Sequence, residues 1–263
     1  MNPLFLLCGI GMMLVGIITP AYWKITQKVL WKFFLWGALA WIIGVALKSI
    51  PPILAPIVDQ IIQEDLPRWF SGPIHWIYIG SLTGVFECGT TLFFAYIIKS
   101  IRTAGWNEAV GFGLSFGAIE ALLVGLGSFI VVLLVILIPD KLPSKIVELA
   151  AAGSDSLWVI PAPIIERAIA VFAHAFSCVL IIYAVQAKAW RWFWVSFFYK
   201  TAIDGFAAYW HLTIGIENVT TAGLWITELI FLPSAIIGLW GLLVFRRRWR
   251  KLLQPTPYSS GCS

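Results

Sequence analysis

The chain has 263 residues, of which 60% are hydrophobic and only 12% charged, and its formal net charge at pH 7 is +5. Soluble domains carry roughly 25% charged residues, so this composition excludes an ordinary soluble protein and predicts an integral membrane protein, which we place in a bacterial-type plasma membrane. We attribute the net positive charge to lysines and arginines of cytoplasmic loops, and we expect no nucleic-acid partner.

Seven stretches of about 20 mostly apolar residues predict an all-α fold, a polytopic membrane bundle of about seven transmembrane helices. In chain order the predicted spans are about 3–22, 30–50, 74–98, 110–138, 162–186, 190–211 and 219–245. Because neither a tandem repeat nor a second domain is visible, we expect a single transmembrane bundle over residues 1–263, with a short cytoplasmic tail at 246–263.

Basic residues predict how the bundle is oriented. Lysines and arginines follow the first, third, fifth and seventh predicted spans, whereas the loops at the opposite ends contain fewer of them. Because such residues favour the cytoplasmic side, we predict that the N-terminus lies outside and the C-terminus in the cytoplasm. We expect the run from Arg246 to Lys251 to bind anionic membrane lipid.

Two of the predicted outer connections are long. Residues 51–72 begin with prolines and continue as an amphipathic piece, which predicts a short helix lying in the interface. Residues 142–152 predict a second surface helix, followed by a turn at 153–156. Each of the two can either cover an outward opening or serve as a plain connecting loop.

The stretch from Pro161 to Tyr183 is apolar enough to cross a bilayer, yet it contains Glu166, Arg167 and His174. Each charged side chain costs roughly 2.5–3.5 kcal/mol at the centre of a membrane, so such residues normally face partners inside a bundle. Glu166 and Arg167 can neutralise each other. This stretch therefore predicts a polar site within the membrane.

Four polar residues from different spans are predicted to lie at a similar depth. Glu87, Glu120, His174 and Lys200 each lie about 10 to 13 residues from an end of a predicted span, which is near the midplane of a core about 30 Å thick. Asp204 follows Lys200 by one helical turn and shares its helix face. We therefore expect these side chains to form one pocket.

The carboxylates in the predicted spans outnumber the cations that can pair with them. The four acids outside the Glu166–Arg167 pair are Glu87, Glu120, Asp204 and Glu228. Their charge must be compensated by protons, by water or by a bound cation. A zinc ion is one answer, because His174 adds an imidazole and histidine with carboxylates is a common zinc set. The alternative is a metal-free network that Lys200 helps to neutralise.

Several short motifs carry a resemblance to a known family. They are Gly84–Thr91 (GVFECGTT), Gly111–Gly113 with Gly117–Ala121, the Glu166–Arg167 pair ahead of His174, and Lys200–Asp204 (KTAID). In this order and at this common depth they resemble the YhfC-type intramembrane metalloprotease family, a distant relative of the PrsW and CAAX-type membrane proteases.

The resemblance implies a metal-dependent peptidase that hydrolyses peptide bonds in or near the bilayer, with a membrane protein or peptide as substrate. Glu87 matches the first Glu of the family's Glu-Glu-x-x-Arg pattern, which is implied to activate a metal-bound water. Glu120 and His174 occupy polar positions of the family, and Asp204 matches the Asp of a His-x-x-x-Asp motif. The implied roles are therefore catalytic for Glu87 and Glu120, and metal-binding, with zinc, for His174 and Asp204.

Three positions depart from the family pattern: Cys88 replaces a second Glu, Thr91 an Arg, and Lys200 the metal-binding His. A protonated lysine repels a metal ion, although a Cys88 thiolate could serve as a soft ligand instead. The departures leave open a catalytically inactive member, or a small-solute transporter or partner-binding protein. In that case Cys88, Glu166, Arg167 and Lys200 belong to a pocket without a cofactor.

Overall fold

The computed structural model describes residues 2–49, 68–152, 156–213 and 220–253. Within these ranges the chain is almost entirely helical and contains no strand, so the predicted all-α fold is confirmed. The principal helices, in chain order, are α1 (Leu6–Gln27), α2 (Trp31–Lys48), α4 (Arg68–Thr83), α5 (Gly89–Ile97), α6 (Lys99–Arg102), α7 (Trp106–Leu137), α8 (Ser144–Ala152), α9 (Pro161–Gln186), α10 (Arg191–Thr213) and α11 (Thr221–Leu253). A π-helical turn, η3 (Gly84–Cys88), joins α4 to α5.

Six segments of the described chain are long and apolar enough to cross a membrane. They correspond to α1, α2, α4 with η3 and α5, α7, α9 and α11. Together they make this an integral membrane protein. Helix α10 covers the predicted span 190–211 but is not one of these six, so the count of seven and the orientation stay predictions.

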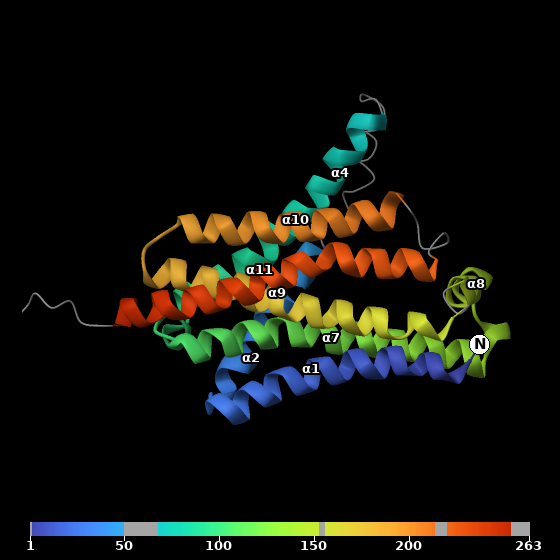
Figure 1. The fold of residues 1–263 in the computed structure, drawn as a ribbon, viewed down its shortest axis with the longest axis horizontal. Helices are drawn as coiled ribbons and strands as arrows, with labels where there is room; N and C mark the ends of the chain where they lie inside the picture. Colours follow the sequence, from blue (N-terminus) through green and yellow to red (C-terminus); the bar gives the residue numbers. More distant parts are fainter. Residues whose placement is uncertain (1, 50–67, 153–155, 214–219, 254–263) are drawn as a thin grey trace, which may run out of the picture.

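The helices pack around α7 and α9. Helix α7 contacts α1, α2 and α9, whereas α10 and α11 pack against α9 and α4 packs against α10. In Figure 1, α1, α7, α9, α11 and α10 run alongside one another, and α4 leaves them obliquely. Two helix pairs approach so closely that only glycine fits: a Cβ on Gly113 would lie 2.7 Å from Ala175 Cα, and one on Gly80 would lie 2.3 Å from the Thr201 carbonyl oxygen.

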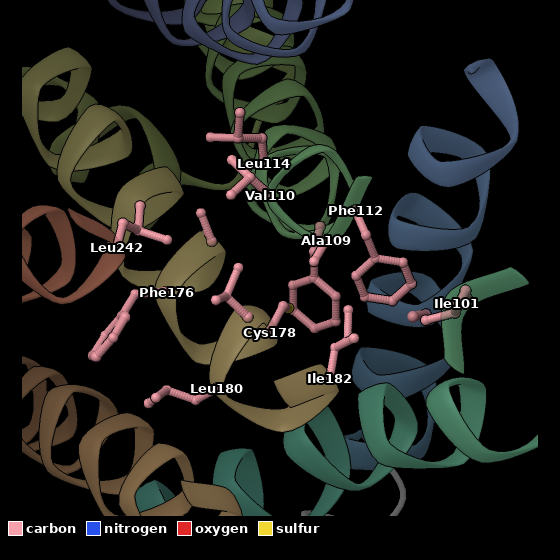
Figure 2. Packing of buried hydrophobic residues seen from close by; sticks show 14 of the residues in the cluster. Ile101, Ala109, Val110, Phe112, Leu114, Phe176, Cys178, Leu180, Ile182 and Leu242 are labelled. Carbon is pink, nitrogen blue, oxygen red and sulfur yellow. The ribbon is translucent and has the colours of Figure 1, made fainter. Parts of the chain in front are cut away.

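The largest hydrophobic cluster fills the space between α7, α9 and their neighbours. Phe112 and Leu180 are fully buried within it, and Trp249 closes it near the end of α11. Figure 2 shows Phe112 of α7, Ile182 of α9 and Ile101 of α6 lying in the space between their helices. This close-packed region holds α7 and α9 in fixed positions. The two helices also carry several of the polar residues of the predicted site.

The segments outside the bundle agree in part with the prediction. Helix α8 forms where residues 142–152 predict a surface helix, and most of its described side chains are exposed. The predicted interfacial helix lies mostly at 51–67, outside the described residues, as does most of the turn at 153–156. The seventh predicted span ends at 245, whereas α11 continues to Leu253, so the basic run lies on its last helical turns.

Candidate functional site

A cavity of about 750 Å³ lies between α2, α4, α7, α9, α10 and α11. Its walls are mostly apolar and include Trp41, Tyr78, Ile169 and Phe231. Charged residues of α2, η3, α7, α9 and α10 line this cavity. We refer to them as the charged network: Lys48, Glu87, Glu120, Glu166, Arg167, His174, Lys200 and Asp204.

Glu87 enters the site from the π-helical turn η3. A π turn adds one residue to a helical turn, and such turns are frequent at functional sites because they re-aim a side chain. The hydroxyls of Thr90 and Thr91 both donate to the Glu87 carbonyl oxygen, at 3.1 and 3.0 Å. These hydrogen bonds hold the turn, so Thr91, which departs from the family pattern, has a backbone partner here.

Lys200 lies at the centre of the charged network. Its Nζ is 3.3 Å from Glu87 Oε2, 3.3 Å from His174 Nδ1 and 3.8 Å from Asp204 Oδ1. The lysine and glutamate side chains are each only 4% exposed. A cation so deeply buried is stable only when carboxylates surround it, and Lys200 meets that condition.

His174 has charged neighbours at both of its ring nitrogens. Its Nε2 is 2.7 Å from Glu120 Oε2, and its Nδ1 faces Lys200 Nζ. Lys200 Nζ is also 3.5 Å from Nε2, and Nδ1 is 3.7 Å from Glu87 Oε2. Each ring nitrogen therefore lies near both an ammonium group and a carboxylate.

Arg167 pairs with two carboxylates of the charged network. Its Nη1 is 2.5 Å from Glu120 Oε1, and its Nη2 pairs with Glu166. Glu166 and Arg167, which were expected to neutralise each other, are thus paired, and Arg167 also pairs with Glu120. Trp41 Nε1 also donates to Glu120, at 3.1 Å from Oε2. Sequence reasoning did not single out Trp41, because no local pattern marks one tryptophan among 15.

Lys48 is the second functional residue that sequence reasoning missed. Its Nζ lies 2.7 Å from Glu87 Oε1, 3.2 Å from Thr83 Oγ1 and 3.8 Å from Asp204 Oδ2. Lysines at the end of an apolar span usually extend to the interface, and Lys48 ends α2. In the predicted spans the carboxylates outnumber the cations that can pair with them, and this excess indicated that the site contains a further cation.

Cys88 lies in a layer next to the charged network. Its Sγ is 3.8 Å from Ser177 Oγ and 3.7 Å from Ser196 Oγ, and the two serine hydroxyls are 2.7 Å apart. All three residues are buried, and Cys88 does not line the cavity. Cys88 therefore has hydroxyl neighbours, and the alternative of a soft metal ligand gains no support from this geometry.

Glu228, the remaining acid of the predicted spans, lies on α11 and is buried. It does not line the cavity, and within the described part of the chain its Oε2 has no hydrogen-bond partner. Glu87 Oε2 and Arg167 Nε are also buried without a hydrogen bond there.

The zinc ion implied by the resemblance can be tested against this arrangement. A zinc site needs three or four donors that converge on one point. Within the residues that the structure describes, no three His, Cys, Asp or Glu side chains are placed to hold a metal ion. Instead, Lys200 Nζ lies between His174 and Asp204, the two predicted ligands. A protonated amine has no lone pair to give, so the residues as arranged do not fit the metal.

Comparisons with known proteins agree with the resemblance drawn from the motifs. A family model described as YhfC intramembrane metalloprotease matches residues 11–230, a range that includes every residue of the charged network. Searches of the curated proteins and of the solved structures found no match.

Proposed function

This chain belongs to the YhfC intramembrane metalloprotease family, and from that premise we propose that it is a protease-like membrane protein that binds an apolar peptide or protein segment without a metal ion. The observation that carries the proposal is the place of Lys200, whose Nζ lies 3.3 Å from both Glu87 and His174. In this proposal Lys200 supplies the positive charge that a metal supplies elsewhere in the family.

Electrostatics supports a permanent role for this lysine. The Lys200 side chain is 4% exposed and faces the carboxylates of Glu87 and Asp204. Before a metal could bind between His174 and Asp204, Lys200 would have to leave its carboxylates or lose its proton. Either change leaves buried charges without partners, which typically costs 3–5 kcal/mol.

The cavity supports binding of an apolar segment. Its volume of about 750 Å³ is within the range of ligand pockets, and its walls are mostly apolar. Five of the elements that line it belong to segments long enough to cross a membrane, namely α2, α4, α7, α9 and α11, which suits a ligand that is itself embedded in the membrane. In this function the charged network binds and orients the segment, and Glu87 holds two lysines in place.

A metal-dependent hydrolase is the second candidate, and two observations favour it. Glu87 Oε2 is buried without a hydrogen bond, and the Glu120–His174 pair is kept at 2.7 Å. If Lys200 moved out, these groups would be placed near Asp204. In that function His174 and Asp204 would hold zinc, which would supply Lewis-acid chemistry, and Glu87 would serve as the general base.

A cleavage assay separates the two candidates. The purified protein is incubated in lipid nanodiscs with a set of apolar peptides, with added zinc and with chelator, and cleavage is followed by mass spectrometry. We expect peptides to bind and to remain intact, with the wild type and Glu87→Gln giving the same spectra. Cleavage that is lost both in Glu87→Gln and on chelation would overturn the proposal in favour of the hydrolase.

A further inference from the structure

Helices α10 and α11 lie beside one another along one wall of the cavity (Figure 1). Ile203 and Ala207 of α10 line this wall, as do Phe231 and Ser234 of α11. Each helix packs closely against α9, whereas the described residues of the two helices do not pack closely against each other. Side chains, rather than tightly packed backbones, therefore close the boundary between α10 and α11, which we call the α10–α11 seam.

Tyr199 and Phe206 of α10 bridge the α10–α11 seam. The Tyr199 hydroxyl donates to the Ser234 carbonyl oxygen at 2.7 Å, and the Phe206 and Phe231 rings meet edge-on with centroids 5.4 Å apart. The hydroxyl reaches the α11 backbone next to Gly238, where an added Cβ would lie 3.4 Å from it. Single contacts of these kinds are weak enough to break and re-form within a folded protein.

Pro233 interrupts α11 at the level of the seam. Proline has no N–H, so the Leu229 carbonyl oxygen cannot receive from Pro233 the hydrogen bond of a regular helix. The Ser234 hydroxyl donates to the Phe231 carbonyl oxygen at 2.7 Å, and serines that bind helix backbone in this way often bend helices. Because helices bend at prolines, Pro233 is a hinge between an N-terminal half of α11, residues 221–232, and the half that follows.

The two halves of α11 differ in how much apolar surface they bury. Among the described residues of the N-terminal half, the buried ones are Thr227 and Glu228, and both are polar. In the half after Pro233 the buried residues other than glycine are apolar: Ala235, Leu242, Phe245 and Trp249. Phe245 also contacts Trp192 of α10, with ring centroids 4.8 Å apart. Apolar burial stabilises an element against local opening, so the N-terminal half opens at the lower free energy.

Glu228 makes the closed position of the N-terminal half less favourable. It is only 6% exposed, and within the described part of the chain its Oε2 has no hydrogen-bond partner. A buried carboxyl oxygen is normally hydrogen-bonded, and leaving it without a partner is costly. A movement that gives Glu228 a partner removes this cost. Opening of the N-terminal half is therefore favoured by a feature of the closed arrangement itself.

We propose that the N-terminal half of α11 is a gate, which rotates about Pro233 and lets an apolar peptide segment enter the cavity from the lipid between α10 and α11. Tyr199 is the latch of this gate, because its hydrogen bond ties α10 to α11 next to the hinge. The exposed side chains of Phe198 on α10 and Leu232 on α11 are apolar, which suits the approach of an apolar segment. The inference rests on the proposed function, because the segment that enters is the ligand proposed above.

A cross-link across the α10–α11 seam tests the gate. Phe206 and Phe231 are replaced by cysteine in the full-length protein with Cys262→Ser, so that the remaining native cysteines are buried. A bifunctional methanethiosulfonate joins the two new cysteines, and a reducing agent releases them. The ligand is a leucine–alanine peptide of about 20 residues with a photoreactive leucine, and its capture in lipid nanodiscs is counted by mass spectrometry. We expect the bridge to lower capture about tenfold and reduction to restore it.

Two controls isolate the effect of the bridge. A monofunctional methanethiosulfonate adds bulk to both cysteines without joining them and should leave most of the capture. A Trp76→Cys/Tyr209→Cys pair, bridged between α4 and α10 where the rings lie 4.4 Å apart, should capture as much as its reduced form. Equal capture by the bridged and the monofunctionally modified Phe206–Phe231 pair would overturn this inference alone. A wild-type protein that captures no peptide would overturn the proposed function and, with it, the gate.

The latch has a test of its own, which decides the matter if the double-cysteine protein does not fold. Exchange of the bound peptide for an isotopically labelled copy is followed by mass spectrometry. Tyr199→Phe lacks the hydrogen bond to Ser234, so exchange should be about fivefold faster with the same amount bound, because a gate changes the rates of entry and release together. Tyr183→Phe, whose ring packs against Phe245, should exchange at the wild-type rate. Unchanged exchange in Tyr199→Phe would overturn the assignment of the latch.

Discussion

The two carboxylate oxygens of Glu87 face different lysines, with Lys48 Nζ 2.7 Å from Oε1 and Lys200 Nζ 3.3 Å from Oε2. Lys48 is 29% exposed and Lys200 only 4%. Because water screens exposed ion pairs, the two lysines differ in what they contribute. Lys200 neutralises carboxylate charge in the buried part of the network. Lys48 adds a positive charge that is more exposed and therefore interacts more weakly.

Removal of the Lys200 ammonium tests this balance. We expect Lys200→Met to lower the free energy of unfolding by about 3–5 kcal/mol, because Glu87 and Asp204 lose a buried partner. Thermal unfolding in detergent is the measurement, with Lys99→Met, an exposed lysine on α6, as the matched control. Thermal stability equal to that of the control would contradict a charge network closed by Lys200.

At the scale of helices, the π turn η3 sets the direction of Glu87. Deletion of Val85, whose side chain is 52% exposed, should restore regular α-helix and turn Glu87 by about 100° relative to Thr83. Lys48 contacts both residues, so it must lose one of them. We expect a lower unfolding temperature than in Val85→Ala, which keeps the turn. Equal behaviour of deletion and substitution would show that the turn does not position the site.

Helix α10, which carries Lys200, packs against α4 and against η3, which follows α4 and carries Glu87. Because a Cβ on Gly80 would lie 2.3 Å from the Thr201 carbonyl oxygen, Gly80→Ala must push the helices apart. We expect a loss of about 1–3 kcal/mol in the free energy of unfolding. The matched control is Gly127→Ala on α7, where nothing lies within 4 Å of the added carbon. Gly80→Ala with the stability of this control would contradict the packing of α4 on α10.

For the whole molecule, the outward surface of the bundle agrees with a membrane environment. Large apolar side chains are exposed on several helices, among them Ile25 of α1, Phe198 of α10 and Trp240 of α11. In a soluble protein such a surface would aggregate, whereas in a bilayer it contacts lipid. The exposed Phe198 also supports the prediction that α10 crosses the membrane, although α10 is less apolar than the six segments above.

Much of the fold and part of the site could be predicted from the sequence. Stretches of apolar residues predict the helical spans. The number of residues from the end of a span gives the depth of a side chain in the membrane, and this depth predicted that Glu87, His174 and Lys200 lie near one another, as they do. Lys48 could not be predicted, because its pairing depends on how α2 packs against η3. The π turn was missed for a related reason: residues 84–88 carry no local pattern that separates a π turn from an α turn. The roles of the site residues and the single-domain organisation stay predictions.

The central claim is that Lys200 takes the place of a metal, and metal content tests it most directly. The wild type, Lys200→His and the control Lys99→His are purified in detergent with zinc present, and bound metal is counted by mass spectrometry. We predict that the wild type and the control hold far less than one zinc per chain, and that Lys200→His gains about one, because it completes a set with His174 and Asp204. About one zinc per wild-type chain, lost in His174→Ala, would contradict the claim and establish a metal centre in this cavity.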